Sequence, residues 1–578
     1  MAPTFHIEHF GCRAARADGE AVSDRLRAAG HCPQQASEAN LVIVNTCSVT
    51  AEADRAARAF IRRAHRLNPA AKIVVTGCYA QRAPDELAAL AGVAAVIGNS
   101  HKALAPQIAQ ELMEPATPQA GAELVQIQSA TMPERATSEQ LAPPQAGSGL
   151  HETPAAQAAS APPQAGNGLH GILAAQAASA SPQVAVQSAT MPERATSEQL
   201  APPQVELAPP QVELAPPQVE LAPPQVVVWA DERFAHSFLE EAQLVPGAQT
   251  RPNLKIQEGC GNRCSFCVIP FTRGPSKSLP HEVVLRQVQG FVATGGNELV
   301  LSGINLGRWG RDLPPAAAGA ETTAPHTLPA LLRLVFHETA LPRLRLSSIE
   351  PMDWDDELIA LMAQFGGSRL ARHAHLPLQS GSDAVLRRMH RRYRPWHYQQ
   401  KVAALLRAAG PELTLGADVM IGFPGETDAE FEETVAFIRS LPFGYLHLFP
   451  FSARPGTRAW ALHAERPVPA LVVDERMARL RALAAEKIRT HRSSTIGREL
   501  EAITLHTAPD LDRLGRTSAM TENFLAVEIE GRLQANRLVR LRMTHLNAEG
   551  ILRATVASSR KAPDGPHVSS PGRIAGSI

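Results

Sequence analysis

Three cysteines lie within eight residues of this chain, at Cys260, Cys264 and Cys267. Cysteine thiolates hold iron–sulfur clusters, and a 4Fe–4S cluster has four irons to ligate. A C-x₃-C-x₂-C loop supplies three of those ligands, so one iron keeps an open position, as in a catalytic rather than a closed structural metal site. A zinc loop or a ferredoxin-like electron carrier is the alternative. Zinc sites, however, usually come as two C-x₂₋₄-C pairs, and no fourth cysteine or obvious histidine closes this loop.

Three further cysteines follow predicted strands near the N-terminus. Residues 4–98 alternate short apolar strands with helical stretches, which predicts an α/β domain with a doubly wound parallel sheet. Cys12 follows the first strand, Cys47 the second and Cys78 the third. Ligands of such sheets collect beyond the carboxyl ends of the strands, so these three thiols are predicted to converge. Chance placement of small buried cysteines is the alternative, and Cys32, which has no such placement, is predicted to be a plain thiol.

The predicted elements of this region are short. The strands are Thr4–Phe10, Leu41–Asn45, Lys72–Thr76 and Val93–Ile97, and the helices are Gly19–Ala29, Ala51–Arg66 and Pro84–Leu90. From about residue 251 the alternation resumes. The strands there are Leu254–Gln257, Glu298–Ser302, Arg343–Ser348, His373–Pro377, Thr414–Ile421 and Tyr445–Pro450, with helices such as His281–Ala293, Asp355–Met362 and Asp428–Arg439. Six β/α units predict an open, partial TIM-type (β/α)6 barrel, whose active site lies at the carboxyl ends of the strands, where the cysteine loop leaves the first one.

The last segment, Arg498–Ala557, alternates apolar and polar residues and has few helix signals. Leu525–Ile529 and Leu538–Met543 are candidate strands in it. We therefore predict a small C-terminal β-barrel, followed by a disordered tail at 559–578.

Residues 111–228 are low in sequence complexity. The segment Gln128–Gln145 recurs unchanged at Gln187–Gln204, and ELAPPQV repeats three times from Glu206. The segment contains eighteen prolines and no aromatic residue, and its repeats lack an amphipathic face that stacking could bury, so we predict a disordered spacer. The segment has eleven Glu and two Arg, so its formal net charge is −9. The rest of the chain therefore carries +9, because the whole chain has a formal net charge of zero. A basic folded portion is compatible with a polyanionic partner.

The cysteine pattern also bears on the compartment. Six of the seven cysteines fall into two triplets rather than into pairs, which favours metal ligation in a reducing compartment over disulfides. The N-terminus has no basic n-region followed by an apolar h-region, and nothing approaches about 18 consecutive apolar residues. We expect a cytoplasmic protein with no membrane partner.

Several segments outside the spacer match one enzyme family. They are Asn45-Thr-Cys-Ser-Val-Thr, Val75-Thr-Gly-Cys-Tyr-Ala-Gln, Leu254-Lys-Ile-Gln-Glu-Gly-Cys, Ser347-Ser-Ile-Glu-Pro, His375-Leu-Pro-Leu-Gln-Ser-Gly-Ser-Asp and Ile421-Gly-Phe-Pro-Gly-Glu-Thr. With the cysteine loop, they resemble the radical S-adenosylmethionine (SAM) methylthiotransferases, most closely the branch that acts on threonylcarbamoyladenosine in tRNA. The resemblance implies an N-terminal cluster domain over 1–110, a radical SAM partial barrel over 245–490 and an RNA-binding TRAM domain over 495–558.

The resemblance implies a role for each matching residue. The catalytic residues would be the six cysteines: Cys260, Cys264 and Cys267 would hold the 4Fe–4S cluster that cleaves SAM, and Cys12, Cys47 and Cys78 a second 4Fe–4S cluster. The SAM contacts would be Gly295, Gly296 and Glu298 around the methionine part and Ser347, Gln379, Ser380, Asp418 and Gly422 around the ribose or adenine. Capping or turn chemistry is the alternative for the last five. The family commonly has an Asn three residues after the first cysteine, where this chain has Ala15.

The implied activity is insertion of a methylthio group at C2 of N6-threonylcarbamoyladenosine at position 37 of tRNA, next to the anticodon. The implied cofactors are two 4Fe–4S clusters and SAM, and the implied partners are the anticodon loop of tRNA and an electron donor such as flavodoxin or ferredoxin. Methylthiolation of isopentenyladenosine in tRNA, or of a ribosomal protein, is an alternative. A non-catalytic, metal-stabilised RNA-binding protein is an alternative from a different class.

Two arginine-rich regions bear on RNA binding. The stretch Arg387–His397 carries five arginines with Tyr393 and Trp396 interleaved, which suits phosphate pairing and stacking on unpaired bases. A solvated surface helix is an equal alternative there. The terminal segment adds arginines suited to gripping a nucleic-acid backbone, namely Arg513, Arg516, Arg532, Arg537, Arg540 and Arg542.

Overall fold

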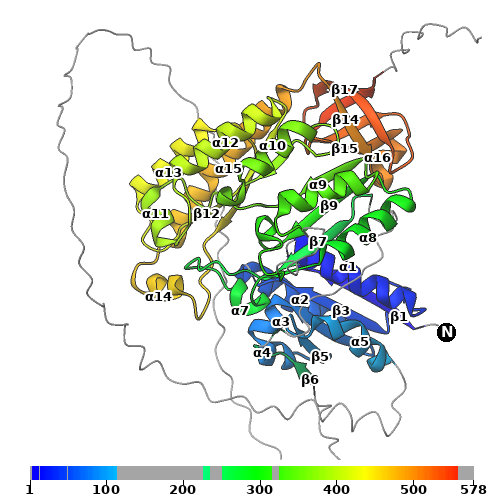
Figure 1. The fold of residues 1–578 in the computed structure, drawn as a ribbon. Coiled ribbons are helices and arrows are strands. Elements are labelled where there is room, and N and C mark those ends of the chain that lie inside the picture. The colour runs from blue at the N-terminus through cyan, green and yellow to red at the C-terminus, as the bar shows by residue number, and fades with distance from the viewer. Residues whose placement is uncertain are drawn as a thin grey trace, which may run out of the picture. The chain divides into compact units, whose positions relative to one another are not determined.

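The structure is a computed structural model that describes residues 3–11, 13–48, 50–113, 226–232, 234, 250–314 and 325–557. Cys12, the predicted tail and almost all of the predicted spacer lie outside those ranges. All the described residues belong to one unit of the chain, drawn in colour in Figure 1. No helix within the described ranges is both long and apolar enough to cross a membrane.

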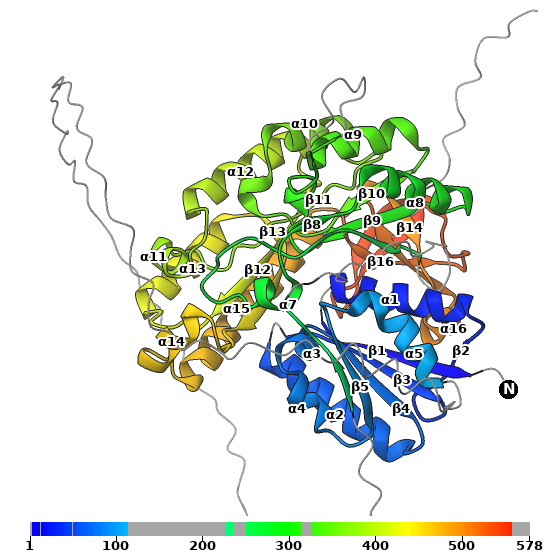
Figure 2. The same ribbon diagram turned by 60° about the horizontal axis from the view of Figure 1, so that its bottom comes forward.

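The N-terminal part is a parallel sheet with helices on both faces. Its strands follow the order β2-β1-β3-β4-β5-β6, and each neighbouring pair is parallel. The strands are β1 (Thr4–His9), β2 (Cys32–Pro33), β3 (Leu41–Thr46), β4 (Lys72–Gly77), β5 (Val93–Gly98) and β6 (Val227–Trp229). Figure 2 shows helices α1 (Arg13–Ala28) and α5 (Ala105–Met113) on one face and α2 (Ala51–Leu67), α3 (Cys78–Arg82) and α4 (Pro84–Ala88) on the other. The central strand β3 is buried along its whole length, as its continuous apolar run requires in a sheet covered on both faces.

The limits predicted for the spacer need correction at both ends. Residues 111–113 are the last residues of α5, and residues 227–228 are the first of β6. Strand β6 pairs with β5 through Ala95–Val227 and Ile97–Trp229, so the chain returns to the same sheet after the insertion. The predicted N-terminal domain, 1–110, therefore omitted its last strand. The three residues of β6 continue the valine-ending repeat before them, which hides the boundary in the sequence.

The central part contains the six predicted parallel strands. They are β7 (Asn253–Glu258), β9 (Glu298–Gly303), β10 (Arg343–Leu346), β11 (His373–His375), β12 (Thr414–Ile421) and β13 (Phe443–Pro450). The first three pair in the order β10-β9-β7, with the short antiparallel strand β8 (Lys277–Ser278) beyond β7, and the last three pair in the order β11-β12-β13. A parallel bridge between Leu344 and Leu370 links the two groups, which confirms the partial (β/α)6 barrel.

Helices cover the outer face of these strands (Figure 1). They are α8 (His281–Ala293), α9 (Leu328–Glu338), α10 (Asp356–Phe365), α11 (Asp383–Arg388), α12 (Pro395–Ala409), α13 (Asp428–Ser440) and α15 (Ala470–Ser493). Helix α7 (Ile269–Arg273) lies beside α3, α14 (Arg458–Glu465) follows β13, and the 3₁₀ turns η2 (Leu306–Arg308) and η3 (Pro351–Asp353) follow β9 and β10. The 3₁₀ turn η1 (Lys102–Leu104) belongs to the N-terminal part, between β5 and α5. In β12, Leu415, Ala417 and Val419 pack into the core with these helices. Gly416 and Asp418 alternate with them and therefore face the inside of the barrel.

The C-terminal part is a closed five-stranded barrel, as predicted. Its strands run β14-β15-β16-β18-β17 around the barrel. They are β14 (Glu499–Thr504), β15 (Arg516–Thr521), β16 (Ala526–Glu530), β17 (Leu538–Leu546) and β18 (Leu552–Val556), with the short helix α16 (Pro509–Arg513). Arg372 Nε donates to Glu522 Oε1 at 2.9 Å, and Asn297 Nδ2 donates to the carbonyl of Asn536 at 2.8 Å. Arg372 and Asn297 immediately precede β11 and β9, so the small barrel closes the amino end of the strands.

Candidate active site

The cysteine loop begins where β7 ends. The Cys260 amide donates to the carbonyl of Gly274 at 3.1 Å, which ties the loop to the segment after α7. Gly259 has a φ of +68°, and a Cβ there would lie 1.9 Å from the Pro275 carbonyl oxygen, so the turn into the loop requires glycine. All three cysteine side chains are partly buried.

The sulfurs of this loop are surrounded by hydrogen-bond donors. The Asn262 backbone amide lies 3.4 Å from Cys260 Sγ, and the side-chain Nδ2 of Asn305 lies 3.7 Å from the same sulfur. Arg391 Nη1 donates to Cys264 Sγ at 3.2 Å. Burial raises the pKa of Cys260 and raises that of Cys267 to about 12, so thiolates here require a bound cation. Three sulfurs, donors to those sulfurs and the need for a cation together fit an iron–sulfur cluster.

Two of the predicted N-terminal ligands, Cys47 and Cys78, lie side by side at the carboxyl edge of the first sheet. Thr46 of β3 pairs with Gly77 of β4, and Cys47 and Cys78 follow these residues directly. Both side chains are nearly fully buried. A Cβ on Gly11 would lie 2.7 Å from Cys47 Sγ, so the backbone that leads to the next residue, the predicted third ligand, packs against Cys47. Cys32 is exposed and pairs with the other end of β1, which agrees with its prediction as a plain thiol.

A single arginine joins the two cysteine groups. Arg273 Nε donates to Cys78 Sγ at 3.2 Å, and Arg273 Nη1 donates to Glu258 Oε1 at 2.7 Å. Glu258 is the last residue of β7, two positions before Cys260. Asn99 Nδ2 adds a second donor to Cys78 Sγ at 3.3 Å. The strand-end sulfur and the cysteine loop are therefore held by one chain of contacts.

Arg273 belongs to a buried network of five charged side chains. The carboxylates of Asp18 and Glu258 form ion pairs with the side chains of Lys102, Lys255 and Arg273. Burial alone would raise the pKa of Glu258, but the three cations hold it well below its ordinary value. This network could not be predicted from the sequence, because its members come from α1, η1, β7 and α7. The one local signal is a glutamate just before the cysteine loop.

Comparisons with known proteins agree with this geometry. A model of the radical SAM superfamily matches residues 254–438, and a model of the uncharacterized protein family UPF0004 matches residues 4–98. The threonylcarbamoyladenosine tRNA methylthiotransferase MtaB of Treponema pallidum (strain Nichols) is 31% identical over 537 residues, which cover 90% of this chain and 94% of that protein. The chain belongs to the radical SAM methylthiotransferase family.

Other relatives share parts of this similarity. The MtaB protein of Bacillus subtilis (strain 168) is 28% identical over 91% of this chain and 90% of its own. A tRNA-2-methylthio-N(6)-dimethylallyladenosine synthase of Cereibacter sphaeroides is 36% identical over 54% of this chain and 66% of its own. Among solved structures, the radical SAM methyltransferase TsrM of Kitasatospora setae aligns with 80% of this chain and 78% of its own, at 13% identity and a TM-score of 0.42. The superfamily match over residues 254–438 and the methylthiotransferase relatives show a radical SAM enzyme that uses SAM and an iron–sulfur cluster, so the non-catalytic alternative is set aside.

The methylthiotransferase brings several predicted SAM contacts to the same end of the barrel as the cysteine loop. Ser347 follows β10, and Gln379 lies beyond β11. The Gln379 backbone amide donates to the Asp418 backbone carbonyl at 2.8 Å. Ser347 Oγ and Gln379 Oε1 are buried and have no hydrogen-bond partner among the described residues. Buried polar atoms left without a protein partner fit a site that a polar ligand completes. Gly422 follows β12 and has a φ of +75°.

Two of the remaining predicted contacts have protein partners instead. Ser380 is fully buried, and its hydroxyl lies 3.0 Å from Thr434 Oγ1 on α13. The same hydroxyl accepts from the Ser382 backbone amide at 3.2 Å, which is a turn contact of the kind given as the alternative. The Asp418 carboxylate lies between His375 and His447, with one oxygen close to each imidazole. Burial alone would raise the pKa of Asp418, but hydrogen bonds from the two histidines hold it well below its ordinary value.

The prediction for Gly295, Gly296 and Glu298 is wrong. These residues lie at the amino end of β9, opposite the cysteine loop, and Asn536 Nδ2 of the small barrel donates to the Gly295 carbonyl at 2.9 Å. Gly295 has a φ of +82° and simply turns the chain between α8 and β9. Glu298 is fully buried against two arginines of β10, at 3.0 Å from Arg345 Nε.

Two residues of the arginine-rich stretch face the protein interior, which fits neither RNA contact nor a solvated surface helix at these positions. Tyr393 is fully buried and donates to the Leu378 carbonyl at 2.7 Å, so it is not available to stack on a base. Arg391 is buried as well, and its Nη2 pairs with Glu350 Oε2 at 2.6 Å while Nη1 contacts Cys264. Of the two interleaved aromatic residues, Trp396 is the exposed one. Arg391 therefore lies beside the cysteine loop, and neither of the two alternatives given for this stretch describes it.

Proposed function

We propose that this methylthiotransferase inserts a methylthio group at C2 of N6-threonylcarbamoyladenosine in tRNA, next to the anticodon. The similarity that supports this substrate extends over nearly the whole chain in relatives named for it. The single structural observation that supports the chemistry is Arg273, which contacts a strand-end cysteine and the glutamate before the cysteine loop at once. An enzyme that joins sulfur insertion to SAM cleavage needs its two sites held together in this way.

The cysteine loop would carry the SAM chemistry. Cys260, Cys264 and Cys267 would hold a 4Fe–4S cluster, which supplies the electron that cleaves SAM when both are bound. Arg391 donates to Cys264 Sγ and is itself fixed by Glu350, so it places positive charge beside the thiolate. Asn305, at the carboxyl side of β9, adds an amide beside Cys260. An electron donor such as flavodoxin or ferredoxin would reduce this site.

The strand-end cysteines would carry the sulfur chemistry. Cys12, Cys47 and Cys78 would hold a second 4Fe–4S cluster, which supplies the place where the inserted sulfur resides. Asn99 and Arg273 both donate to the sulfur of Cys78, and such donors set the potential of a sulfur-ligated centre. Ser347, Gln379 and Gly422 would contact SAM, because the first two present buried polar atoms without protein partners and all three follow barrel strands.

The small barrel would grip the tRNA backbone. Five of its six predicted arginines are exposed, namely Arg513, Arg532, Arg537, Arg540 and Arg542, and Arg516 is half-buried. Exposed arginines bind phosphates without reading the base sequence, so recognition of the target base would be a task of the radical SAM barrel.

Nucleoside mass spectrometry tests this proposal directly. In tRNA from a strain that lacks this chain, we expect the methylthio derivative of threonylcarbamoyladenosine to disappear and the unmethylthiolated nucleoside to accumulate. The full-length chain should restore the product, and a Cys264→Ala variant should not.

A second candidate substrate is dimethylallyladenosine in tRNA. The observation that favours it is the higher identity, 36%, to a synthase of that product over about half of this chain. Loss of its methylthio derivative in the same strain, with threonylcarbamoyladenosine unaffected, would reject the first substrate and support the second. An unchanged tRNA profile together with a lost modification on a ribosomal protein would reject both.

A further inference from the structure

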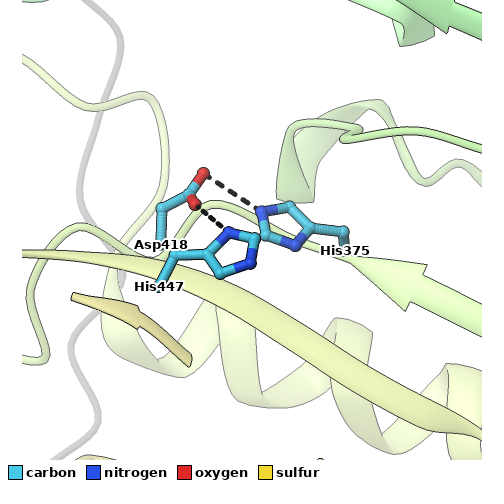
Figure 3. A group of neighbouring side chains, drawn as sticks. All are labelled: His375, Asp418 and His447. Carbon is cyan, nitrogen blue, oxygen red and sulfur yellow. Dashed lines mark hydrogen bonds and ion pairs between the residues drawn. The ribbon is translucent and has the colours of Figure 1, made fainter. Parts of the chain in front are cut away.

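Three neighbouring strands of the barrel present an imidazole, a carboxylate and a second imidazole on one face. His375 ends β11, Asp418 lies within β12, and His447 lies opposite Asp418 in β13. Figure 3 shows the two neighbouring rings, each turned toward one oxygen of the Asp418 carboxylate. This cluster contains no cysteine, so it is distinct from both cysteine groups.

The spacing of the three groups suits a metal ion. His375 Nε2 lies 3.0 Å from Asp418 Oδ2, and His447 Nδ1 lies 3.2 Å from Asp418 Oδ1. One atom from each residue can be chosen so that all three lie within 4.8 Å of one another. Ligand atoms held at about 2.0–2.2 Å around a tetrahedral zinc ion lie roughly 3.4 Å apart. Small side-chain rotations are therefore enough to bring all three onto one ion.

The far side of His375 is fixed as a metal ligand requires. Its Nδ1 lies 2.9 Å from Tyr445 Oη, and the same hydroxyl lies 2.8 Å from His373 Nε2. Metal-binding histidines almost always hydrogen-bond through their second ring nitrogen, which fixes the ring and its tautomer. A Cβ on Gly416 would lie 2.3 Å from Tyr445 Oη, so glycine at this position makes room for the tyrosine.

The cluster is also open to an ion from solution. The side chain of His447 is 61% exposed and that of Asp418 is 27% exposed, whereas that of His375 is 8% exposed. The buried histidine with its tyrosine thus provides the rigid side of the cluster, and His447 provides the accessible side.

We propose that His375, Asp418 and His447 form a binding site for a divalent transition metal ion, separate from both cysteine groups. Two imidazoles and one carboxylate suit zinc or ferrous iron, whereas calcium and magnesium prefer oxygen ligands alone. Three protein ligands leave at least one coordination position for water or an anionic oxygen of a bound molecule. The proposal does not depend on which tRNA nucleoside is the substrate.

Zinc titration of the full-length, cluster-loaded protein tests this site. Loading the clusters first under anaerobic conditions occupies the six predicted cluster cysteines, so added zinc reports on ligands outside the clusters. After equilibrium dialysis, metal analysis should give one saturable zinc per chain. A His447→Gln variant should lose this zinc, and a Tyr445→Phe variant should bind it about 10- to 100-fold more weakly.

His337→Gln is the matched control. His337 Nδ1 lies 2.9 Å from Glu338 Oε1 at the exposed end of α9, so it is a histidine beside a carboxylate outside the proposed site. This variant should bind zinc like the unaltered chain. The visible absorption of the clusters should be the same in all variants, which separates lost binding from lost folding.

Crystals soaked in zinc give a test that needs no variant. An anomalous difference peak within bonding distance of His375, Asp418 and His447 is the expected result. Absence of that peak, absence of saturable zinc in the unaltered chain, or undiminished binding in His447→Gln would each overturn the proposal and leave an ion-pair network as the role of these residues.

Discussion

The two cysteine groups of this methylthiotransferase are built in opposite ways. Cys260, Cys264 and Cys267 come from one loop after one strand, and their side chains are partly buried. Cys47 and Cys78 directly follow two neighbouring strands, β3 and β4, and are nearly fully buried. Local chain geometry is enough to assemble the loop, whereas the strand-end group exists only after β3 and β4 have paired.

The difference fits the tasks proposed for the two groups. A cluster that binds SAM at an open iron needs access for that ligand, and the partly buried loop provides it. A site that keeps a sulfur for transfer gains from exclusion of water, and the buried strand ends provide that. Arg273 and its network are the point where the two environments meet.

Removal of one loop cysteine should have the largest effect. Cys264→Ala leaves two thiolates for the cluster that cleaves SAM, so we expect complete loss of 5′-deoxyadenosine formation. Liquid chromatography of anaerobic reactions with a chemical reductant measures this product. Cleavage at the unaltered rate would contradict the role of the loop.

Removal of one strand-end cysteine should separate the two groups. Cys47→Ala should retain SAM cleavage and lose the methylthio product, because only the second cluster loses a ligand. Iron content should fall from about eight to about four per chain. Cys32→Ala, which alters an exposed thiol, is the control and should keep both activities. Methylthio product from the Cys47→Ala protein would refute the second cluster.

Neutralising the carboxylate between the two groups should weaken the fold. Glu258→Gln leaves Lys102, Lys255 and Arg273 buried with one carboxylate, and such an unpaired charge costs about 3–5 kcal/mol of unfolding free energy. Urea denaturation measures the change. Glu357→Gln is the matched control, since Glu357 pairs with Arg333 at 2.9 Å on the surface and should cost about 1 kcal/mol or less. Equal losses in the two variants would show that the buried network does not hold the groups together.

The smallest expected effect is the change in unfolding free energy when Glu298 is titrated with acid. Glu298 lies at the end of the barrel away from both cysteine groups. Burial alone would raise the pKa of Glu298, but Arg345, Arg251 and Arg343 hold it below its ordinary value of 4.5. The unfolded chain therefore takes up this proton at a higher pH than the folded chain. Ionised Glu298 adds stability that is fully present above about pH 4.5 and is lost as the pH falls through the lowered value.

Glu298→Gln isolates this contribution. Its urea midpoint should depend less steeply on pH between about 5 and 3 than that of the unaltered chain. A steeper dependence in the variant would contradict the lowered pKa. Glu298 is remote from the cysteines. This measurement therefore also shows how much of the stability lost in acid comes from the folded chain itself rather than from the clusters.

Much of the fold could be predicted because its elements are local patterns. Strand β12 and helix α8 have the predicted bounds, since one is an apolar run and the other a periodic helix between clear breaks. Strand β6 could not be predicted, because three residues next to a repeat carry too little signal and only pairing with β5 makes them a strand.

The site residues, too, could be predicted only where the signal is local in the sequence. The cysteines were found because their spacing, or their place after a strand, is visible in the sequence. Gly295 was misassigned because a glycine turn before a strand looks the same whether it contacts a ligand or another domain. Arg391 was misassigned because its partners, Glu350 and Cys264, are 41 and 127 residues away in the chain.

The N-terminal sheet is built from two segments that are far apart in the sequence, because strand β6 pairs with β5 after the insertion. A protease cut between residues 114 and 225 would yield two polypeptides, and the second would still contribute an edge strand to the first. The Lys102 and Asp18 side chains of one fragment would remain paired with Glu258 and Arg273 of the other. The enzyme is therefore suited to reconstitution from separately expressed halves.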